Sequence, residues 1–300
     1  MAYCYRMLGS VQDAEDLVQD TMLRAWKAQD RYDASRASVR TWLYRIATNA
    51  CLTALEGRAR RPLPSGLGAP SRDPYAPLQP ADDIPWLQPF PDARFDVGAR
   101  ADMRLALVVA LQMLPPRQRA VLVLREVLEF SAAEVAGQLD TTVAAVNSTL
   151  QRARAAVAGM TDPGEVREAG DPRARAVVDK YMRAFESADV PGLVQLLARE
   201  AVLEMPPVPL WYRGREHYGA FMLRVFEMRG PGWQTRYVSA NGQPALATYA
   251  PALSGQLPYH SLQVLSVADD QVTSNVVFAD PRMAAEFGLP ARVQPTNPGR

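Results

Sequence analysis

The sequence of 300 residues is poor in cysteine and histidine, and each shortage excludes a class of protein. Two cysteines, Cys4 and Cys51, cannot build a disulfide-rich scaffold, and neither lies in a CxxC metal-binding pattern. With only His217 and His260, a histidine-rich metal centre is excluded as well. We therefore expect a protein that works without a metal or any other cofactor.

The sequence also lacks a large net charge and long apolar runs. The 33 basic and 32 acidic residues leave a formal net charge of +1, which argues against general coating of polyanions but not against reading of specific DNA sites. No apolar run is long enough to span a membrane, and no basic stretch followed by an apolar core opens the chain. We expect a soluble protein of the reducing cytoplasm with no membrane partner.

Proline is abundant instead, with 25 residues, and its distribution divides the chain. Nine prolines fall between Pro62 and Pro91, where they prevent a continuous helix or central strand and predict an extended linker. A second break, rich in Gly, Asp and Pro, runs from Gly159 to Pro172. The predicted segments are 1–60, a linker over 61–98, 99–159, a hinge over 160–172, and 173–300.

Hydrophobic periodicity assigns a structural class to each folded segment. Apolar residues recur at helical spacing over 11–29, over 36–56 and in four stretches within 99–159, whereas no convincing strand pattern precedes residue 200. Alternating patterns bounded by turn signals then predict strands over Trp233–Ala240, Ala245–Ala250, His260–Val267 and Gln271–Phe278. The chain is therefore predicted to be multidomain, with two all-helical modules followed by one α+β module.

The first two predicted helices each have a polar side opposite an apolar one. Over 11–29, the inward face is expected to hold Ala14, Leu17, Val18, Thr21, Met22, Ala25 and Trp26. Its other side carries Asp13, Asp16 and Asp20, for which a solvated acidic surface is the simplest interpretation. Over 36–56, the inward face is expected to hold Val39, Trp42, Leu43, Ile46, Ala47, Ala50 and Ala54. The outer face carries Arg40, Thr41, Tyr44, Arg45, Thr48 and Asn49, a set that suits phosphates and unpaired bases.

Three stretches here resemble region 2 of bacterial RNA polymerase sigma factors, and more narrowly the extracytoplasmic-function (ECF) group. They are Asp13–Asp20 (DAEDLVQD), Leu23–Trp26 (LRAW) and Arg40–Asn49 (RTWLYRIATN). The resemblance implies that the acidic helix docks on the clamp helices of the polymerase β′ subunit, through Asp13, Asp16, Gln19 and Asp20. It also implies that the second helix captures a flipped base of the minus-ten promoter element, through Arg40, Thr41, Tyr44, Arg45 and Asn49.

Two positions leave alternatives open within this resemblance. Trp42 points inward by the helix count, so it either packs in the core or contacts a base. The family usually has a further helix before Arg6, and only about five residues precede it here, so we expect a shortened region 2.

The segment 99–159 carries the signals of a helix-turn-helix. Ser131 with Glu134 three residues later forms a capping-box pattern for a short helix over 131–139, and Asp140 begins a turn before a longer helix. A plain helical hairpin is the structural alternative. The stretches Leu114–Leu122 (LPPRQRAVL), Ser131–Ala136 (SAAEVA) and Val146–Arg154 (VNSTLQRAR) are similar to sigma region 4.

In that family, region 4 reads the minus-thirty-five promoter element and contacts the flap of the β subunit. The outward positions that the resemblance assigns to this DNA contact are Asn147, Ser148, Thr149, Gln151, Arg152 and Arg154. Asn and Gln side chains pair with adenine edges, while arginines suit phosphates.

The C-terminal segment resembles SnoaL-like domains, which are α+β cones around a pocket. The resemblance rests on Met205-Pro206-Pro207, on Trp211–Arg215 (WYRGR) and on the order of the predicted elements. The side chains expected either to line a pocket for a small ligand or to pack in the core are Met205, Trp211, Tyr212, Phe221 and His260.

Some relatives with this fold are enzymes, and they need a proton-transfer group in the pocket. The available acid–base groups are Glu204, His217, His260 and Asp280, and a lone His such as His260 is more often a hydrogen-bonded core residue. An isomerase or hydrolase acting on a small apolar molecule is therefore the alternative function for this domain.

Three large apolar residues interrupt the polar, Pro-rich linker: Trp86, Leu87 and Phe90. Exposed aromatic residues in a flexible segment are costly, so we expect them to dock, either as a small cluster on one helical module or as a contact with the C-terminal domain. The sequence as a whole predicts a non-enzymatic sigma factor that binds core RNA polymerase and promoter DNA, with a C-terminal domain that regulates it. A repressor acting without polymerase is a further alternative.

Overall fold

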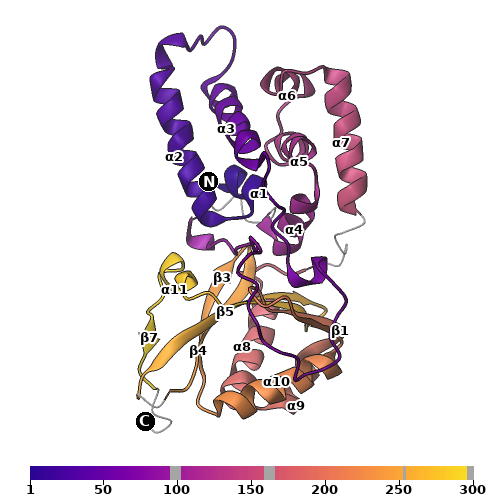
Figure 1. Cartoon of the computed structure of the whole chain (residues 1–300), viewed down its shortest axis with the longest axis vertical. Helices are drawn as coiled ribbons and strands as arrows, with labels where there is room; N and C mark the ends of the chain where they lie inside the picture. The colour runs from indigo at the N-terminus through magenta and orange to yellow at the C-terminus, as the bar shows by residue number, and fades with distance from the viewer. Residues whose placement is uncertain (95–102, 159–165, 253–254, 296–300) are drawn as a thin grey trace. The chain divides into compact units, whose positions relative to one another are not determined.

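The computed structural model describes residues 1–94, 103–158, 166–252 and 255–295. The chain forms two compact units, coloured by residue number in Figure 1. The first unit comprises Met1–Arg61 with Phe95–Pro163, and the second comprises Pro62–Arg94 with Gly164–Arg300. Residues 62–94 therefore pack within the second unit. The predicted boundaries at 98/99 and 159/160 lie outside the described residues.

The first half of the helical unit contains the two helices predicted from periodicity. Its elements are α1 (Ala2–Leu8), α2 (Val11–Lys27), the 3-10 turn η1 (Gln29–Arg31) and α3 (Val39–Leu55). Ser10 caps α2 by accepting a hydrogen bond from the Asp13 N–H at 3.2 Å, and Ser38 caps α3 through the Thr41 N–H at 3.1 Å. Both predicted helices are confirmed, and each begins at a serine that satisfies an otherwise unpaired donor.

The predicted inward face of α2 is wrong at its carboxyl-terminal end. Met22 is 54% exposed and Trp26 is 68% exposed. The buried residues of α2 form a narrow stripe made of Val11, Ala14, Leu17, Thr21 and Ala25. Positions 22 and 26 lie one residue further around the helix, about 100° away, so they miss the contact with α1 and α3.

The outer face of α3 was also predicted wrongly at one position. Thr48 is completely buried, because its Oγ1 lies 2.7 Å from the Tyr3 hydroxyl and donates to the Tyr44 carbonyl at 2.6 Å. A hydroxyl that finds two partners can be buried at little cost. Val39, expected inward, is exposed at the start of the helix.

The second half of the helical unit is a helix-turn-helix preceded by two further helices. Its elements are α4 (Leu105–Met113), α5 (Pro116–Leu122), the π-helical turn η6 (Val123–Val127), α6 (Ala132–Gln138) and α7 (Val143–Ala158). Ser131 and Glu134 form the predicted capping box at the start of α6. Asp140 takes a positive φ of 50° in the turn that separates α6 from α7.

A buried arginine joins the two halves of this unit. The Arg119 guanidinium donates to the Met7 carbonyl of α1, to Gln112 Oε1 at 2.7 Å and to the Leu114 carbonyl at 3.2 Å. Gln112 Nε2 in turn donates to the Arg6 carbonyl at 3.1 Å. Burial lowers the pKa of Arg119 to about 10, so the side chain remains charged at neutral pH. These bonds fix the helices before the helix-turn-helix to α1.

The second unit is built on a mixed sheet with helices packed beside it (Figure 1). Its strands are β1 (Leu197–Glu204), β2 (Trp211–Arg213), β3 (Gln234–Ala240), β4 (Gln243–Tyr249), β5 (Leu257–Ala268), β6 (Gln271–Phe278) and β7 (Arg292–Val293). The order along the sheet is β2-β1-β6-β5-β4-β3, with β7 paired to β5, and only the β1–β6 pair is parallel. The four predicted strands are confirmed. The expectation that no strand precedes residue 200 is wrong, because β1 begins at Leu197.

The helices of this unit are α8 (Pro172–Glu186), α9 (Val190–Leu196), α10 (Arg215–Arg229) and α11 (Arg282–Glu286). The core lies between α8, α10 and the sheet, where Tyr181 and Phe185 of α8 and Phe221 and Phe226 of α10 are buried together. Phe185 meets Phe226 edge-on, with ring centroids 5.4 Å apart. The sheet and these helices thus form the expected α+β cone.

Residues 62–94, hereafter the strap, run as an irregular chain over the second unit (Figure 1). The strap contains only the short turns η2 (Pro64–Gly66) and η3 (Asp92–Arg94). Backbone hydrogen bonds hold it: the Ser71 N–H donates to the Trp211 carbonyl at 2.8 Å, and the Ala81 N–H donates to the Pro207 carbonyl at 2.9 Å. The Pro-rich segment is therefore extended, as predicted, but fastened along its length.

Candidate functional site

The acidic side of α2 is partly free and partly neutralised by neighbours. Asp16 and Gln19 are exposed. Asp20 pairs with Arg24 at 2.8 Å, one turn along the same helix. Asp13 is more strongly engaged, since Arg58 lies 3.0 Å and Arg61 2.7 Å from its carboxylate. The four residues follow one another along the exposed side of α2, but Asp16 carries the least compensated charge among them.

Exposed apolar side chains continue this surface toward the carboxyl-terminal end of α2. Met22, Leu23 and Trp26 are all more than half exposed. Large exposed apolar groups next to free carboxylates are typical of a surface that meets another protein.

The outer face of α3 is accessible toward its carboxyl-terminal end and contacts neighbouring elements at its amino-terminal end. Arg45 and Asn49 are exposed. Arg40 Nη2 instead donates to the Leu128 carbonyl at 2.6 Å, and its guanidinium carbon lies 4.1 Å from the centre of the Phe130 ring. Of the five α3 residues singled out by the sequence, Arg45 and Asn49 are therefore accessible. Arg40 is hydrogen-bonded to the segment that leads into α6.

The neighbours of Arg40 on the α3 face are held in the same way. Thr41 Oγ1 donates to Glu134 Oε1 of α6 at 3.2 Å. The Tyr44 ring is edge-on to Phe130 and to Tyr3, at 5.4 Å in both cases. The helix-turn-helix thus contacts the amino-terminal half of the α3 face, where Thr41 and Tyr44 are half-buried and Arg40 remains exposed.

A groove of about 590 Å³ lies beside the amino-terminal half of α3. Its charged lining residues are three arginines, Arg31, Arg36 and Arg45, and two carboxylates, Asp33 and Glu134 of α6. Trp42, whose role the sequence left open, is half-buried, packs on Tyr32 at 5.0 Å and also lines this groove. The groove offers cations and aromatic rings together, the combination that binds single-stranded nucleic acid.

The outward side of α7 presents a polar row. Asn147, Ser148, Gln151, Arg152 and Arg154 are exposed, whereas Val146, Leu150 and Ala153 are buried. Two arginines already have local partners: Arg152 Nη2 donates to Thr149 Oγ1 at 3.0 Å, and Arg154 pairs with Glu126 at 2.6 Å. Asn147 and Gln151 are the exposed amides of the row, as a helix that enters a major groove requires.

The three apolar residues of the strap all contact the second unit. Phe90 is fully buried, its N–H donates to Asn241 Oδ1 at 2.8 Å, and the Asn241 N–H returns a bond to the Phe90 carbonyl at 3.0 Å. Leu87 is 1% exposed. Trp86 is half-buried and donates through Nε1 to the Ala81 carbonyl at 3.0 Å.

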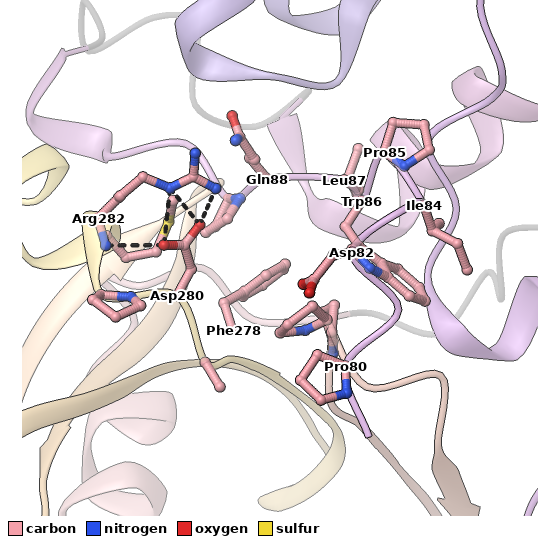
Figure 2. A pocket seen from close by; sticks show the side chains of 16 residues that line it. Pro80, Asp82, Ile84, Pro85, Trp86, Leu87, Gln88, Phe278, Asp280 and Arg282 are labelled. Atoms are coloured by element: carbon pink, nitrogen blue, oxygen red, sulfur yellow. Dashed lines mark hydrogen bonds and ion pairs between the residues drawn. The ribbon is translucent and has the colours of Figure 1, made fainter. Parts of the chain in front are cut away.

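Trp86 and Leu87 also line a cavity of about 440 Å³ (Figure 2). Phe278 at the end of β6 and the ion pair between Asp280 and Arg282, at 2.7 Å, lie among its other lining residues. Strap and sheet thus enclose this cavity together.

A second, smaller cavity lies inside the cone, and three of the five pocket residues named from the sequence line it. Met205, Phe221 and His260 border a space of about 170 Å³. Trp211 and Tyr212 are not among its lining residues. They hold the strap instead: Trp211 Nε1 donates to the Gly68 carbonyl at 2.9 Å, and the Tyr212 hydroxyl donates to the Asp73 carbonyl at 3.0 Å.

Sequence reasoning missed the polar residues of this cavity. Asn275 and Gln263 line it, on β6 and β5. The local signal was weak, because Thr273 and Val277 flank Asn275 at strand spacing and only Val277 is apolar. Tyr181 and Tyr218, which contact the Asn275 amide, come from two helices that no local pattern connects to β6.

Family models match the chain in three consecutive parts. They are Sigma-70 region 2 over residues 1–61, Sigma-70 region 4 over residues 104–157, and a SnoaL-like domain over residues 178–284. The chain is 48% identical over 301 residues to the ECF RNA polymerase sigma factor SigG of Mycobacterium tuberculosis, covering 97% of this chain and 80% of that protein. It is 29% identical to SigJ of the same organism, covering all of this chain and 95% of SigJ.

The solved structures include a whole-length match. The crystal structure of SigJ from Mycobacterium tuberculosis superimposes with a TM-score of 0.67 at 25% identity, covering 97% of this chain and 96% of SigJ. The chain belongs to the ECF RNA polymerase sigma factors. It binds core RNA polymerase and directs promoter recognition and transcription initiation. Its fold is that of sigma regions 2 and 4 followed by a SnoaL-like domain.

In this sigma factor the acid–base candidates Glu204 and Asp280 of the SnoaL-like domain have structural partners. Glu204 Oε2 accepts a hydrogen bond from the Ser65 N–H of the strap at 2.8 Å, and burial raises its pKa. Asp280 is bound by Arg282. Burial, with a further contribution from Arg229, lowers the pKa of His260 to about 4, so its imidazole is neutral at pH 7.

The described residues of the sigma factor contain neither a candidate metal-binding cluster nor a candidate membrane span. No group of three or more His, Cys, Asp or Glu side chains is placed to hold a metal ion within those residues. Likewise, no described helix is long and apolar enough to cross a membrane.

Proposed function

We propose that α2 is the surface through which this sigma factor docks on the clamp helices of the β′ subunit, and that region 4 contacts the flap of β. Asp16, Gln19 and Asp20 support this assignment because they are accessible along one side of α2, with Met22 and Trp26 exposed beyond them. Asp13 would join the contact after exchanging Arg58 and Arg61 for a cation of the polymerase.

The minus-ten element would be read by α3 in two steps. Arg45 and Asn49 are exposed and can meet DNA first. Arg40 is exposed too but is hydrogen-bonded to Leu128, and Thr41 and Tyr44 are half-buried against Glu134 and Phe130. Capture of a flipped base offsets the few kcal/mol that unstacking costs, and it needs the whole face. We therefore expect the helix-turn-helix to move away from α3 when the polymerase and promoter bind.

The minus-thirty-five element would be read by α7. Asn147 and Gln151 are placed for base edges, and Ser148, Thr149, Arg152 and Arg154 for phosphates and neighbouring groups. In this proposal, segments 1–60 and 99–159 carry the polymerase and promoter contacts. Segments 61–98 and 160–172 connect them to 173–300, and the protein acts in the cytoplasm together with its polymerase.

The C-terminal domain would regulate this activity without catalysing a reaction. The strap that joins region 2 to region 4 is bound along its length by this domain, through Trp211, Tyr212 and Asn241 among others. Any change that loosens or tightens the strap therefore changes how freely regions 2 and 4 separate. Trp86, Leu87 and Phe90 would be the apolar anchors of that coupling.

The observation that carries the proposal is the accessible Arg45–Asn49 edge of α3, and it suggests a direct experiment. Binding of the polymerase holoenzyme to a forked DNA with a single-stranded minus-ten element is measured for Asn49→Ala. We expect about a tenfold loss of affinity, because one base contact contributes roughly 1–3 kcal/mol. Thr53→Ala, an exposed position one turn further along α3, is the matched control and should bind as the wild type does. Equal affinities of all three proteins would refute the assignment of α3.

A further inference from the structure

The cavity inside the SnoaL-like cone has the size of a single aromatic ring. Its volume is about 170 Å³, and most of its lining is apolar, including Met205, Phe185, Phe221 and Trp233. For comparison, an apolar protein cavity of about 150 Å³ stays dry and binds benzene. Aromatic rings and thioethers surround a planar ring favourably.

One buried polar atom of this cavity has no partner. Asn275 is 1% exposed, and its Nδ2 lies 2.6 Å from the Tyr218 hydroxyl, 2.9 Å from Gln263 Oε1 and 3.1 Å from the Tyr181 hydroxyl. In the hydrogen-bond network of the structure, the amide donor of Asn275 faces the Gln263 carbonyl oxygen and the two tyrosine hydroxyls. Asn275 Oδ1 is therefore the atom left without a hydrogen-bond partner among the described residues. A buried acceptor without a donor is costly unless a bound molecule supplies one.

The charges around the cavity restrict the ligand to a neutral molecule. His260 lines the cavity, and burial holds its pKa near 4, so it offers no positive charge at pH 7. The guanidinium of Arg229 also belongs to the lining, but that residue is exposed at the end of α10. An anion bound beside Asn275 would thus lie against the Asn275 Oδ1 acceptor, and no buried cation among the lining residues would compensate its charge.

The strap supplies one wall of the cavity. Leu78 lines it, and the chain just before Leu78 is fixed by α10: Arg224 Nη1 donates to the Pro74 carbonyl at 2.8 Å and to the Ala76 carbonyl at 2.7 Å. The same helix contributes Phe221, Met222, Val225 and Met228 to the lining. A molecule in the cavity therefore touches both the strap and the helix that anchors it.

We propose that this cavity is a binding site for a small neutral phenol. The ring lies among Phe185, Phe221 and Trp233, its hydroxyl donates to Asn275 Oδ1, and Leu78 of the strap covers it. Any effect of such a molecule on transcription rests on the proposed regulatory role of the strap. Binding of the molecule does not depend on that role, so a binding measurement tests the site separately from the regulation.

The test compares p-cresol with toluene, which has the same ring and methyl group but no hydroxyl. Both affinities are measured on the full chain by ligand-observed NMR and calorimetry. In the wild type we expect p-cresol to bind at least as tightly as toluene, because the new hydrogen bond offsets desolvation of the hydroxyl. In Asn275→Leu, the preference for p-cresol over toluene should fall at least tenfold, since an unpaired buried hydroxyl costs about 1–3 kcal/mol.

Three further variants keep the test decisive if Asn275→Leu fails to fold. Val225→Phe fills the cavity and should abolish binding of both compounds, while Leu78→Ala should weaken both without changing their ratio. Leu223→Ala, an exposed α10 position outside the lining, should bind as the wild type does. The proposal is overturned if the wild type does not bind p-cresol, if it prefers toluene by tenfold, or if Val225→Phe still binds. An unchanged ratio in folded Asn275→Leu would overturn it equally.

Discussion

In the proposed promoter contact, single side chains on α7 divide into those that contact phosphates and those that read bases. Arg152 is exposed and holds only Thr149, so its guanidinium can exchange that neutral partner for a phosphate. Asn147 is exposed near the start of α7, where the recognition helix of a helix-turn-helix meets base edges. Truncation of Arg152 and truncation of Asn147 should therefore change promoter binding in different ways.

We predict that Arg152→Ala weakens promoter binding about equally on all sequences and reduces the salt dependence of binding by about one counterion. Asn147→Ala should instead alter the preference at one base pair, by about 1–3 kcal/mol. Footprinting on a set of minus-thirty-five sequences, at several salt concentrations, distinguishes these outcomes. Footprints unchanged in both variants would contradict the assignment of α7.

His260 provides a pH-dependent contribution to stability. Burial lowers its folded-state pKa to about 4, whereas an unfolded chain restores an ordinary value near 6.5. Between these two values the unfolded state binds more protons than the folded state, so acid favours unfolding. The contribution of neutral His260 is therefore fully present above pH 6.5 and is lost as the pH falls toward 4.

We predict that urea unfolding of the second unit becomes easier between pH 7 and pH 5, and that His260→Gln reduces this change. Tryptophan fluorescence is a suitable signal, because the Trp233 ring lies 5.1 Å from His260. The same shift of the urea midpoint in both proteins would mean that His260 is not held neutral in the fold.

At the scale of elements, α3 and α6 are in contact beside the α3 residues proposed to read the minus-ten element. Glu134 serves two purposes: it completes the capping box of α6 with Ser131, and it accepts a bond from Thr41 of α3. Glu134 also lines the groove with Arg31, Arg36 and Arg45, so we expect its carboxylate to repel a nucleic acid phosphate there.

Glu134→Gln separates the capping role of this residue from its charge, because glutamine retains the capping box but lacks the negative charge. We predict that the variant binds a single-stranded minus-ten oligonucleotide about two- to fivefold more tightly, from the roughly 0.5–1 kcal/mol that an exposed charge contributes. Fluorescence anisotropy measures the affinity, and circular dichroism checks that helix content is retained. Unchanged or weaker binding would argue that Glu134 does not restrict the groove.

Element identity could be predicted from the sequence wherever the determining contacts are local. The capping box of Ser131 and Glu134 set the start of α6, and the turns at Asn241 and Asp269 take the positive φ that such residues tolerate. Predictions failed where the partner is distant in the chain. Thr48 is buried by Tyr3, and Trp26 is exposed because α1 and α3 cover only a narrow stripe of α2.

The residues of the candidate site were likewise predictable where their contacts are local and unpredictable where their partners are distant in the chain. Residues on one helix, such as Arg45 and Asn49 or Asn147 and Gln151, could be chosen from spacing and resemblance, because a helix places them on one face. That Arg40 contacts Leu128 and Phe130 could not be predicted, since these residues lie about 90 positions further along the chain. Asn275 was missed because its partners come from separate helices.

The whole molecule combines a promoter-reading half with a domain that holds the connection between its parts. The prolines of the strap prevent a helix, and yet Phe90 is fully buried and its N–H donates to Asn241 of the SnoaL-like domain. A near-neutral net charge of +1 gives little general attraction to DNA, so the polymerase must help to bring this protein to its promoters.

Transcription in vitro with purified core RNA polymerase tests this account most directly. Transcripts from a genomic fragment library are mapped with core alone, with core plus the wild-type chain, and with core plus Asp16→Ala/Asp20→Ala. We predict discrete start sites that share minus-thirty-five and minus-ten sequences for the wild type, and loss of these starts together with weaker core binding for the variant. If the wild type binds core but yields the same start sites as core alone, the account of this chain as a promoter-directing subunit is contradicted.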